Sequence, residues 1–194
     1  MNKKTDIKTI TFVTGNLNKL REVKAILIGE DNSGLNIVNK KLDLPELQGD
    51  PEFVAREKCR LASMEVDGPV LSEDTSLCFN ALGGLPGVYV KWFISKIGLT
   101  GLNNLLKAYE DKSAYVQCIF AYSHKPGVEP ILFVGRCNGT IIKQRGENGF
   151  GFDAIFLPDG ETETFAELPS TRKNIISHRA IALQKVKDFF TQHK

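Results

Sequence analysis

The sequence has 194 residues, which is enough for one domain with a substantial core or for two close lobes. Apolar residues make up 42% and charged residues 25%, as in an ordinary globular protein. The formal net charge is only +2 and no block of like charge occurs, so neither stable nucleic-acid binding nor attraction to an anionic membrane is expected. No apolar run approaches the roughly 20 residues of a membrane-spanning helix. The lysine-containing start of the chain is not typical of a signal peptide.

The four cysteines are Cys59, Cys78, Cys118 and Cys137, and they lie far apart in the sequence. Because no Cys-x-x-Cys spacing occurs, a zinc site is not expected. We expect buried, reduced thiols and therefore a cytoplasmic location, since thiols stay reduced in that compartment.

The first half of the chain alternates between strand and helix patterns. Strands are predicted at 9–13 and 35–38, on either side of a helix that begins at Leu17 and ends at the glycine-containing stretch 29–34. Asp50-Pro51-Glu52 begins a second helix, with Asp50 as its N-cap. A third strand starts at 69–71, and we expect it to end where charged and hydroxyl side chains begin at Glu73.

The second half predicts a hairpin between two helices. Helical spacing favours a helix over 99–109, and strands are expected at 114–122 and 131–135, with a possible extension of the second strand to 140–142. Ser177 is the expected cap of a last helix that continues through Phe190. This order predicts an α/β fold with a mixed sheet and flanking helices, in which the hairpin is a candidate second lobe.

Three acids form a candidate metal site, namely Glu46, Glu73 and Asp74. Magnesium prefers oxygen ligands and usually takes only one or two carboxylates from a protein. Because Glu73 and Asp74 are neighbours, a continuing strand would point them to opposite faces, so only one would share a site with Glu46. The alternative is that both acids cap the turn that follows. We infer that Asp74 holds a metal ion and acts on a phosphate, since ligands of open α/β sheets bind beyond the carboxyl ends of the strands.

A glycine turn at Thr14-Gly15-Asn16 joins the first strand to the first helix, and Lys19 follows one turn later. Free N–H groups at a helix start attract phosphate, and glycine lets the backbone approach a ligand closely. The alternative is an ordinary strand-to-helix turn with a surface lysine. The sequence contains no P-loop.

The last third of the chain carries two more candidate binding segments. Phe150-Gly151-Phe152-Asp153 could offer an aromatic face to a base and a carboxylate to a polar ligand edge, although turn phenylalanines also serve as core residues. Three cations surround the start of the last helix, where the helix dipole disfavours them. They indicate an anionic or carbonyl-bearing partner, or else a solvated face; they are Lys173, His178 and Arg179.

Eight short motifs, in order along nearly the whole chain, resemble the inosine triphosphate pyrophosphatase family, enzymes that remove non-standard purine nucleoside triphosphates. Each motif alone is weakly specific, whereas eight in the same order are highly specific. They are Thr-Gly-Asn-x-x-Lys at 14–19, Asp-Leu-Pro-Glu at 43–46, Glu-Asp-Thr-Ser-Leu at 73–77, Leu-Gly-Gly-Leu-Pro-Gly at 82–87, Lys-Trp-Phe at 91–93, Phe-Gly-Phe-Asp at 150–153, Thr-Phe-Ala-Glu-Leu at 164–168 and Lys-Asn-x-x-Ser-His-Arg at 173–179.

The resemblance implies a single nucleoside triphosphate pyrophosphatase domain over 1–194, with an elongated mixed sheet and two lobes around a central cleft. It implies hydrolysis of inosine, deoxyinosine and xanthosine triphosphates between the α and β phosphates, giving a monophosphate and pyrophosphate. Magnesium is the implied cofactor, with manganese as a possible substitute. The implied assembly is a homodimer.

The resemblance also implies roles for individual residues. The phosphates would be held by Thr14, Gly15, Asn16, Lys19 and Lys58, with Lys91 and Lys173 near the triphosphate. Glu46 and Asp74 would hold the metal, and Asp74 would orient or deprotonate the attacking water. Phe152 would stack on the base where many relatives have Trp, with Thr75, Phe150 and Gly151 also in the substrate site. Asp153, His178 and Arg179 would contact the base edge.

Donors at His178 and Arg179 would match the carbonyl of inosine or xanthosine and would be left unpaired against the amino group of adenine. Guanine shares this carbonyl, so its 2-amino group must be refused elsewhere. Two alternative functions are considered beside this one. The chain could be a related pyrophosphatase that acts on another modified nucleotide, or a nucleotide-binding protein without turnover.

Overall fold

The computed structural model describes residues 8–27 and 35–192. Two segments about which the sequence makes predictions lie outside the described residues, namely the chain start at 1–7 and the stretch 28–34. Within the described ranges, none of the helices has the length and apolar character needed to cross a bilayer.

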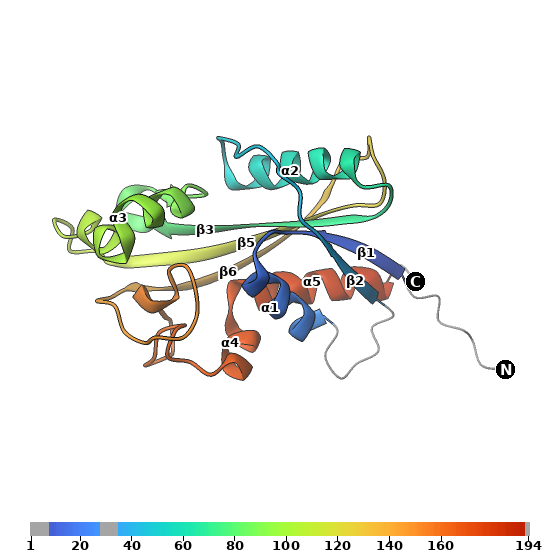
Figure 1. Ribbon diagram of the computed structural model, residues 1–194. Helices are drawn as coiled ribbons and strands as arrows, with labels where there is room; N and C mark the ends of the chain where they lie inside the picture. Colours follow the sequence, from blue (N-terminus) through green and yellow to red (C-terminus); the bar gives the residue numbers. More distant parts are fainter. Residues whose placement is uncertain (1–7, 28–34, 193–194) are drawn as a thin grey trace. The chain divides into compact units, whose positions relative to one another are not determined.

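Seven strands form one mixed sheet in the order β2-β1-β3-β5-β6-β7, with β4 paired to β3 (Figure 1). β1 is parallel to β2 and β3, whereas β4 is antiparallel to β3 and β7 to β6. The predicted mixed α/β fold is confirmed. The elements are β1 Lys8–Val13, α1 Leu17–Leu27, β2 Leu35–Lys40, α2 Pro51–Glu65, β3 Val70–Phe79, β4 Pro86–Gly87, α3 Val90–Leu105, β5 Ser113–Ser123, β6 Ile131–Ile141, β7 Phe156–Pro158, α4 Ser170–Ile176 and α5 His178–Gln192, with 3-10 turns at Asn80–Leu82 and Asp153–Ile155.

The chain divides into two compact units. The first unit comprises 1–74, 119–134 and 182–194, and the second comprises 75–118 and 135–181. The expectation that the hairpin forms a lobe of its own is wrong, because β5 and β6 each contribute residues to both units. Both strands are 11 residues long, and β6 continues past Gly139 to Ile141, so the hairpin extends through both units.

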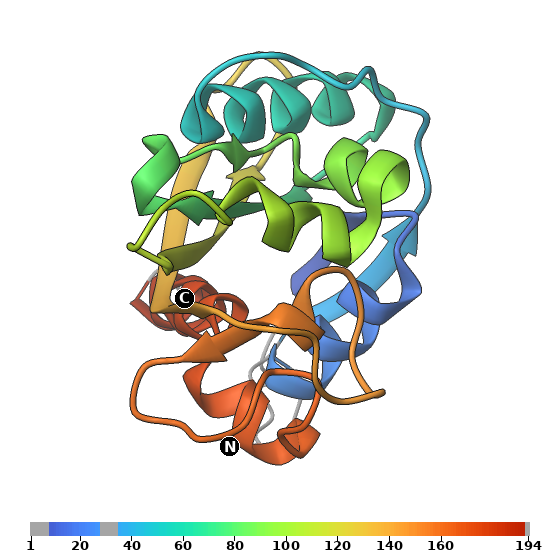
Figure 2. The same cartoon turned by 90° about the vertical axis from the view of Figure 1, so that its left-hand side faces the viewer.

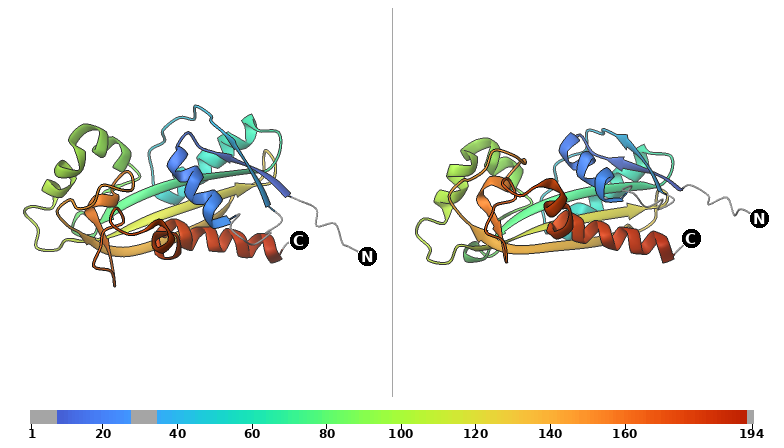
Figure 3. Two further views of the ribbon diagram at one scale, coloured as in Figure 1. Left: turned by 60° about the horizontal axis from the view of Figure 1, so that its bottom comes forward. Right: turned by 90° about the horizontal axis from the view of Figure 1, so that it is seen from below.

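One cluster of core residues in the first unit lies where α2 packs on the sheet. The apolar stripe that helical spacing predicts on α2 is buried, and Cys59 and Ala62 contact Val13, Val70 and Ala121. Figure 1 shows α2 on one face of the sheet, and Figure 3 shows α1 and the later part of α5 on the other face. The first unit is therefore layered, with strands between helices.

The core of the second unit contains several buried aromatic residues. Its members include Leu77, Phe79, Leu102, Phe156 and Phe165, all fully buried or nearly so. Figure 2 shows α3 and the segment at 142–177 on opposite sides of the strands of this unit. Packing from both sides lets apolar residues follow one another in β3, instead of alternating.

The helix predicted over 99–109 differs from α3 at both ends. α3 begins at Val90 and is kinked at Gly98, which has φ 65° and ψ −176°. Glycine adopts this left-handed backbone without the steric cost of a Cβ. The helix ends at Leu105, and the Lys112 ammonium donates to the carbonyls of Leu106 and Tyr109 just beyond it.

β3 does not end at the acids, as the sequence suggested, but continues through them to Phe79. Its pairing with β1 stops where Val13 lies opposite Ser72. Beyond that point β5 remains its neighbour in the sheet, and Leu77 to Phe79 are buried. A strand continues while one neighbour and a core remain available, so Glu73 and Asp74 lie within β3 at the level where β1 has ended.

Candidate functional site

The turn at Thr14-Gly15-Asn16 is organised by its own side chains. Asn16 caps α1, because its Oδ1 accepts the backbone N–H groups of Asn18 at 3.0 Å and Lys19 at 3.2 Å. Thr14 Oγ1 accepts the N–H of Asn16 at 3.1 Å. The turn therefore has a defined conformation, with the positive end of the α1 dipole at Asn16.

Gly15 has a second role that the sequence did not indicate. A Cβ at this position would lie 3.4 Å from Cε of Lys41, so the aliphatic part of the Lys41 side chain covers the glycine. Lys41 directly follows β2, which ends beside β1 in parallel register. The parallel strand order was the signal that could have placed this cation at the turn, because carboxyl ends of parallel strands meet at one edge of the sheet.

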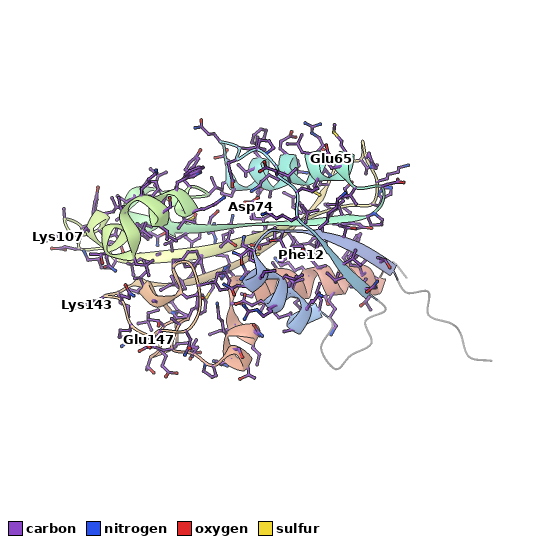
Figure 4. The ribbon with its side chains drawn as sticks, in the orientation of Figure 1. Phe12, Glu65, Asp74, Lys107, Lys143 and Glu147 are labelled. Atoms are coloured by element: carbon purple, nitrogen blue, oxygen red, sulfur yellow. The ribbon has the colours of Figure 1, made fainter. Side chains whose placement is uncertain are left out.

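The two neighbouring acids of β3 have different lysine partners. Glu73 Oε2 lies 3.1 Å from Lys19 Nζ of α1, whereas Asp74 Oδ1 lies 3.0 Å from Lys58 Nζ of α2. Side chains alternate between the two faces of a strand, and α1 and α2 cover opposite faces. We call these residues, together with Glu46, the acid–lysine cluster; Figure 4 labels Asp74 on β3.

Lys58 brings the acids of two separate segments together. Its Nζ is 3.0 Å from Asp74 Oδ1 and 3.4 Å from Glu46 Oε2. Glu46 lies in the loop before α2, so its approach to β3 depends on tertiary structure. Lys58 thus joins Glu46 to Asp74 of β3, while the expectation that only one β3 acid shares a metal site with Glu46 stays a prediction.

Burial and charge act in opposite directions within this cluster. Burial raises the pKa of Asp74 above its usual value, and the charges of Lys58 and Lys19 offset only part of this effect. Burial by itself would lower the pKa of Lys58, but Asp74 and Glu46 outweigh it and raise that pKa. The cluster therefore keeps Lys58 charged while making Asp74 a stronger base than a solvated aspartate.

The donor set of the cluster fits a hard divalent cation. Glu46 and Asp74 offer carboxylate oxygens that already converge on one ammonium group. Among the described residues there is no group of three or more His, Cys, Asp or Glu that could hold a metal ion. Two carboxylates, completed by water and phosphate oxygens, are what magnesium usually takes from a protein.

A second cluster lies in the second unit, around a buried ion pair. Lys173 Nζ of α4 is 2.6 Å from Asp153 Oδ2, and the two side chains are 7% and 5% exposed. The same carboxylate oxygen accepts the backbone N–H of Phe150 at 2.9 Å. α4 was not predicted from the sequence, because seven residues after a proline carry too few periodic positions.

Arg179 is buried at the start of α5, close to Phe150. Its Nη2 donates to Thr75 Oγ1 at 3.2 Å, and its guanidinium carbon is 5.6 Å from the centre of the Phe150 ring. Lys173 Nζ is 4.7 Å from that ring. The predicted cap of α5 is confirmed, since Ser177 Oγ accepts the N–H of Ala180 at 3.2 Å. We call Thr75, Phe150, Asp153, Lys173 and Arg179 the cation–aromatic cluster.

The remaining predicted residues of the second unit lie at its core or surface. Phe152 is buried in the core with its ring 6.1 Å from that of His178, which favours the packing alternative over base stacking. Phe150 is only partly buried and presents its ring to the two cations. Gly151 provides a turn with φ 63°, and Lys91 is exposed at the start of α3 with Nζ 5.9 Å from the Trp92 ring centre.

Known proteins match this chain over nearly its whole length. The model of the Ham1 family matches residues 10–189. The chain belongs to the Ham1 family. It is 52% identical over 185 residues to a protein of Fusarium vanettenii named inosine triphosphate pyrophosphatase, a match that covers 95% of this chain and 97% of the relative.

Solved structures of similar proteins share the fold. The Ham1 protein of Staphylococcus aureus is 27% identical with a TM-score of 0.83, covering 96% of this chain and all of that one. The nucleoside-triphosphatase or dITP/XTP pyrophosphatase of Mycobacterium abscessus is 28% identical with a TM-score of 0.71, covering 92% and 97%. Both the resemblance drawn from the motifs and the expected fold class are confirmed, whereas the roles of single residues stay predictions.

Proposed function

We propose that this Ham1-family chain is a pyrophosphatase that hydrolyses inosine, deoxyinosine and xanthosine triphosphates to the monophosphate and pyrophosphate. The names of its Fusarium and Mycobacterium relatives support the substrate class. The observation that carries the proposal is the convergence of Glu46 and Asp74 on Lys58, because phosphoryl chemistry needs carboxylates for a metal ion beside a cation for phosphate.

In the proposed reaction the acid–lysine cluster acts on the triphosphate. Glu46 and Asp74 would hold magnesium, which when bound neutralises phosphate charge and acidifies bound water. Lys19 and Lys58 bind phosphate oxygens, and Asp74 accepts a proton from the attacking water. The oxygen of that water joins one phosphorus as the bridging α–β oxygen leaves with the other, so that monophosphate and pyrophosphate form together.

The cation–aromatic cluster would recognise the base. Phe150, rather than the buried Phe152, offers the ring on which a purine can stack. Arg179 donates to the carbonyl of inosine or xanthosine, while Asp153 holds Lys173 and the backbone of Phe150 in place. An amino group in place of that carbonyl would set donor against donor, which disfavours adenine strongly.

The test is to supply inosine, xanthosine, adenosine and guanosine triphosphates with magnesium and identify the products. Pyrophosphate from the first two is expected, whereas orthophosphate would indicate a γ-phosphatase and no product a nucleotide-binding protein. Asp74→Asn should abolish turnover while inosine triphosphate still binds. The exposed Asp188→Asn is the matched control and should keep full activity. Near-normal turnover by Asp74→Asn would refute the assignment.

The assembly, location and metal are finer parts of the same proposal. We propose a homodimer that uses magnesium in the cytoplasm and binds neither nucleic acid nor membrane stably. The cysteines support a reducing compartment, because all four are free thiols and three are buried. Light scattering tests the dimer, which should have twice the mass of one chain.

A further inference from the structure

Glu73 is the most buried acid of the acid–lysine cluster, with a side chain only 1% exposed. Its position on β3 explains this burial. β1 ends at Val13, opposite Ser72, so the chain leaves the sheet for the turn at 14–16 at the level of Glu73. Glu73 therefore lies in the sheet beside the turn that begins α1, and it faces away from Asp74.

The partner of Glu73 lies at the start of α1, just after the turn at 14–16. Lys19 lies in the first turn of α1, with its N–H capped by Asn16 and its ammonium 3.1 Å from Glu73. The Lys19 side chain is 19% exposed, so one end of the ion pair reaches solvent while the other is buried. An ammonium has three donor hydrogens, so it can remain on Glu73 and still donate to a phosphate oxygen.

A free lysine side chain samples many rotamers, and restricting it costs conformational entropy when a ligand binds. A buried carboxylate that already holds the ammonium removes most of this cost before the ligand arrives. In the proposed function the metal belongs to Glu46 and Asp74, because these two acids converge on Lys58, whereas Glu73 holds the Lys19 ammonium.

We infer that Glu73 is a positioning residue, which holds the Lys19 ammonium beside the turn at 14–16 and is not a metal ligand. The inference rests on the proposed function for the identity of the phosphate ligand. Its consequence is a division between adjacent acids. Asp74 serves the metal and the attacking water, whereas Glu73 serves phosphate binding through Lys19.

The experiment combines Glu73→Gln and Lys19→Met in a double-mutant cycle with two readouts. Tripolyphosphate binding is measured by calorimetry without magnesium, and Mn²⁺ binding without nucleotide is measured by electron paramagnetic resonance. Glu46→Gln is the matched control for loss of a metal ligand. Neither readout depends on turnover, so failure of the proposed function would be seen separately as missing pyrophosphate release.

Glu73→Gln should weaken tripolyphosphate binding about tenfold, as expected for loss of a charge-assisted contact. In the Lys19→Met background the same change should have less than about a twofold effect. Mn²⁺ affinity should stay within about twofold of the unmodified protein, whereas Glu46→Gln should lower it about tenfold or more. With inosine triphosphate, Glu73→Gln should raise KM more than it lowers kcat.

Three results would overturn the inference. One is a loss of Mn²⁺ affinity in Glu73→Gln as large as in Glu46→Gln, which would make Glu73 a metal ligand. Another is an equal effect of Glu73→Gln on tripolyphosphate binding with and without Lys19, which would make the role of Glu73 purely structural. The third is no tripolyphosphate binding by the unmodified protein. If Glu73→Gln does not fold, Glu73→Asp keeps the charge but withdraws it by one methylene, and the same criteria apply.

Discussion

The ion pair of Asp153 and Lys173 allows a quantitative prediction, because both side chains are buried and only 2.6 Å apart. Lys173→Met removes the charge but keeps a long apolar side chain. It leaves the Asp153 carboxylate buried without its ammonium partner, while the N–H of Phe150 still donates to it. Breaking a buried pair in this way costs about 3–5 kcal/mol of unfolding free energy, which is roughly a 100- to 5,000-fold shift in the folding equilibrium.

Urea denaturation followed by circular dichroism measures this loss. Arg172→Met is the matched control from the same helix, because Arg172 is 50% exposed and its pair with Glu161 should contribute less than about 1 kcal/mol. In an Asp153→Asn background, Lys173→Met should cost far less, since no unpaired charge is left. A loss below about 1 kcal/mol for Lys173→Met alone would show that the carboxylate is not desolvated, and the reasoning would fail.

Two further predictions concern a thiol and a glycine. Burial, helped by nearby acids, raises the pKa of Cys137 to about 11. At pH 8 its alkylation by iodoacetamide should therefore be roughly 100-fold slower than that of an ordinary cysteine. Peptide mass mapping over time measures this rate, and alkylation of Cys137 as fast as that of an ordinary cysteine would contradict the prediction. Gly149→Ala should destabilise the protein more than Gly160→Ala. Both glycines have positive φ, but only a Cβ at Gly149 would lie 2.6 Å from the Asp153 carboxylate. Equal melting temperatures of the two variants would refute the steric reason.

Local patterns predicted those elements whose ends are marked by local chemistry. The start of α2 at Pro51 follows from proline and acid in the first helical turn, and the start of α5 follows from the Ser177 hydroxyl. The end of β3 was missed because a strand ends where neighbours and core end. Neither is visible in the residues around Glu73, whose charge alone suggested a turn.

The candidate site shows the same division. The resemblance assigned Glu46 and Asp74 to the metal and Lys58 to the phosphates, but the order of these residues along the chain does not say which cation meets which acid. The observed contacts join Lys58 to both acids and leave Lys19 to Glu73. Pairing between residues far apart in sequence depends on how helices pack on the two faces of the sheet.

By itself, then, the sequence determined the family, the mixed sheet with its helices and the residue types of the chemistry, because motifs and apolar periodicity are local properties of the chain. Only the tertiary structure decided that Phe152 lies in the core while Phe150 faces the cations. Two phenylalanines two residues apart in a turn have no fixed periodicity. Their burial therefore depends on which neighbours the rest of the chain supplies.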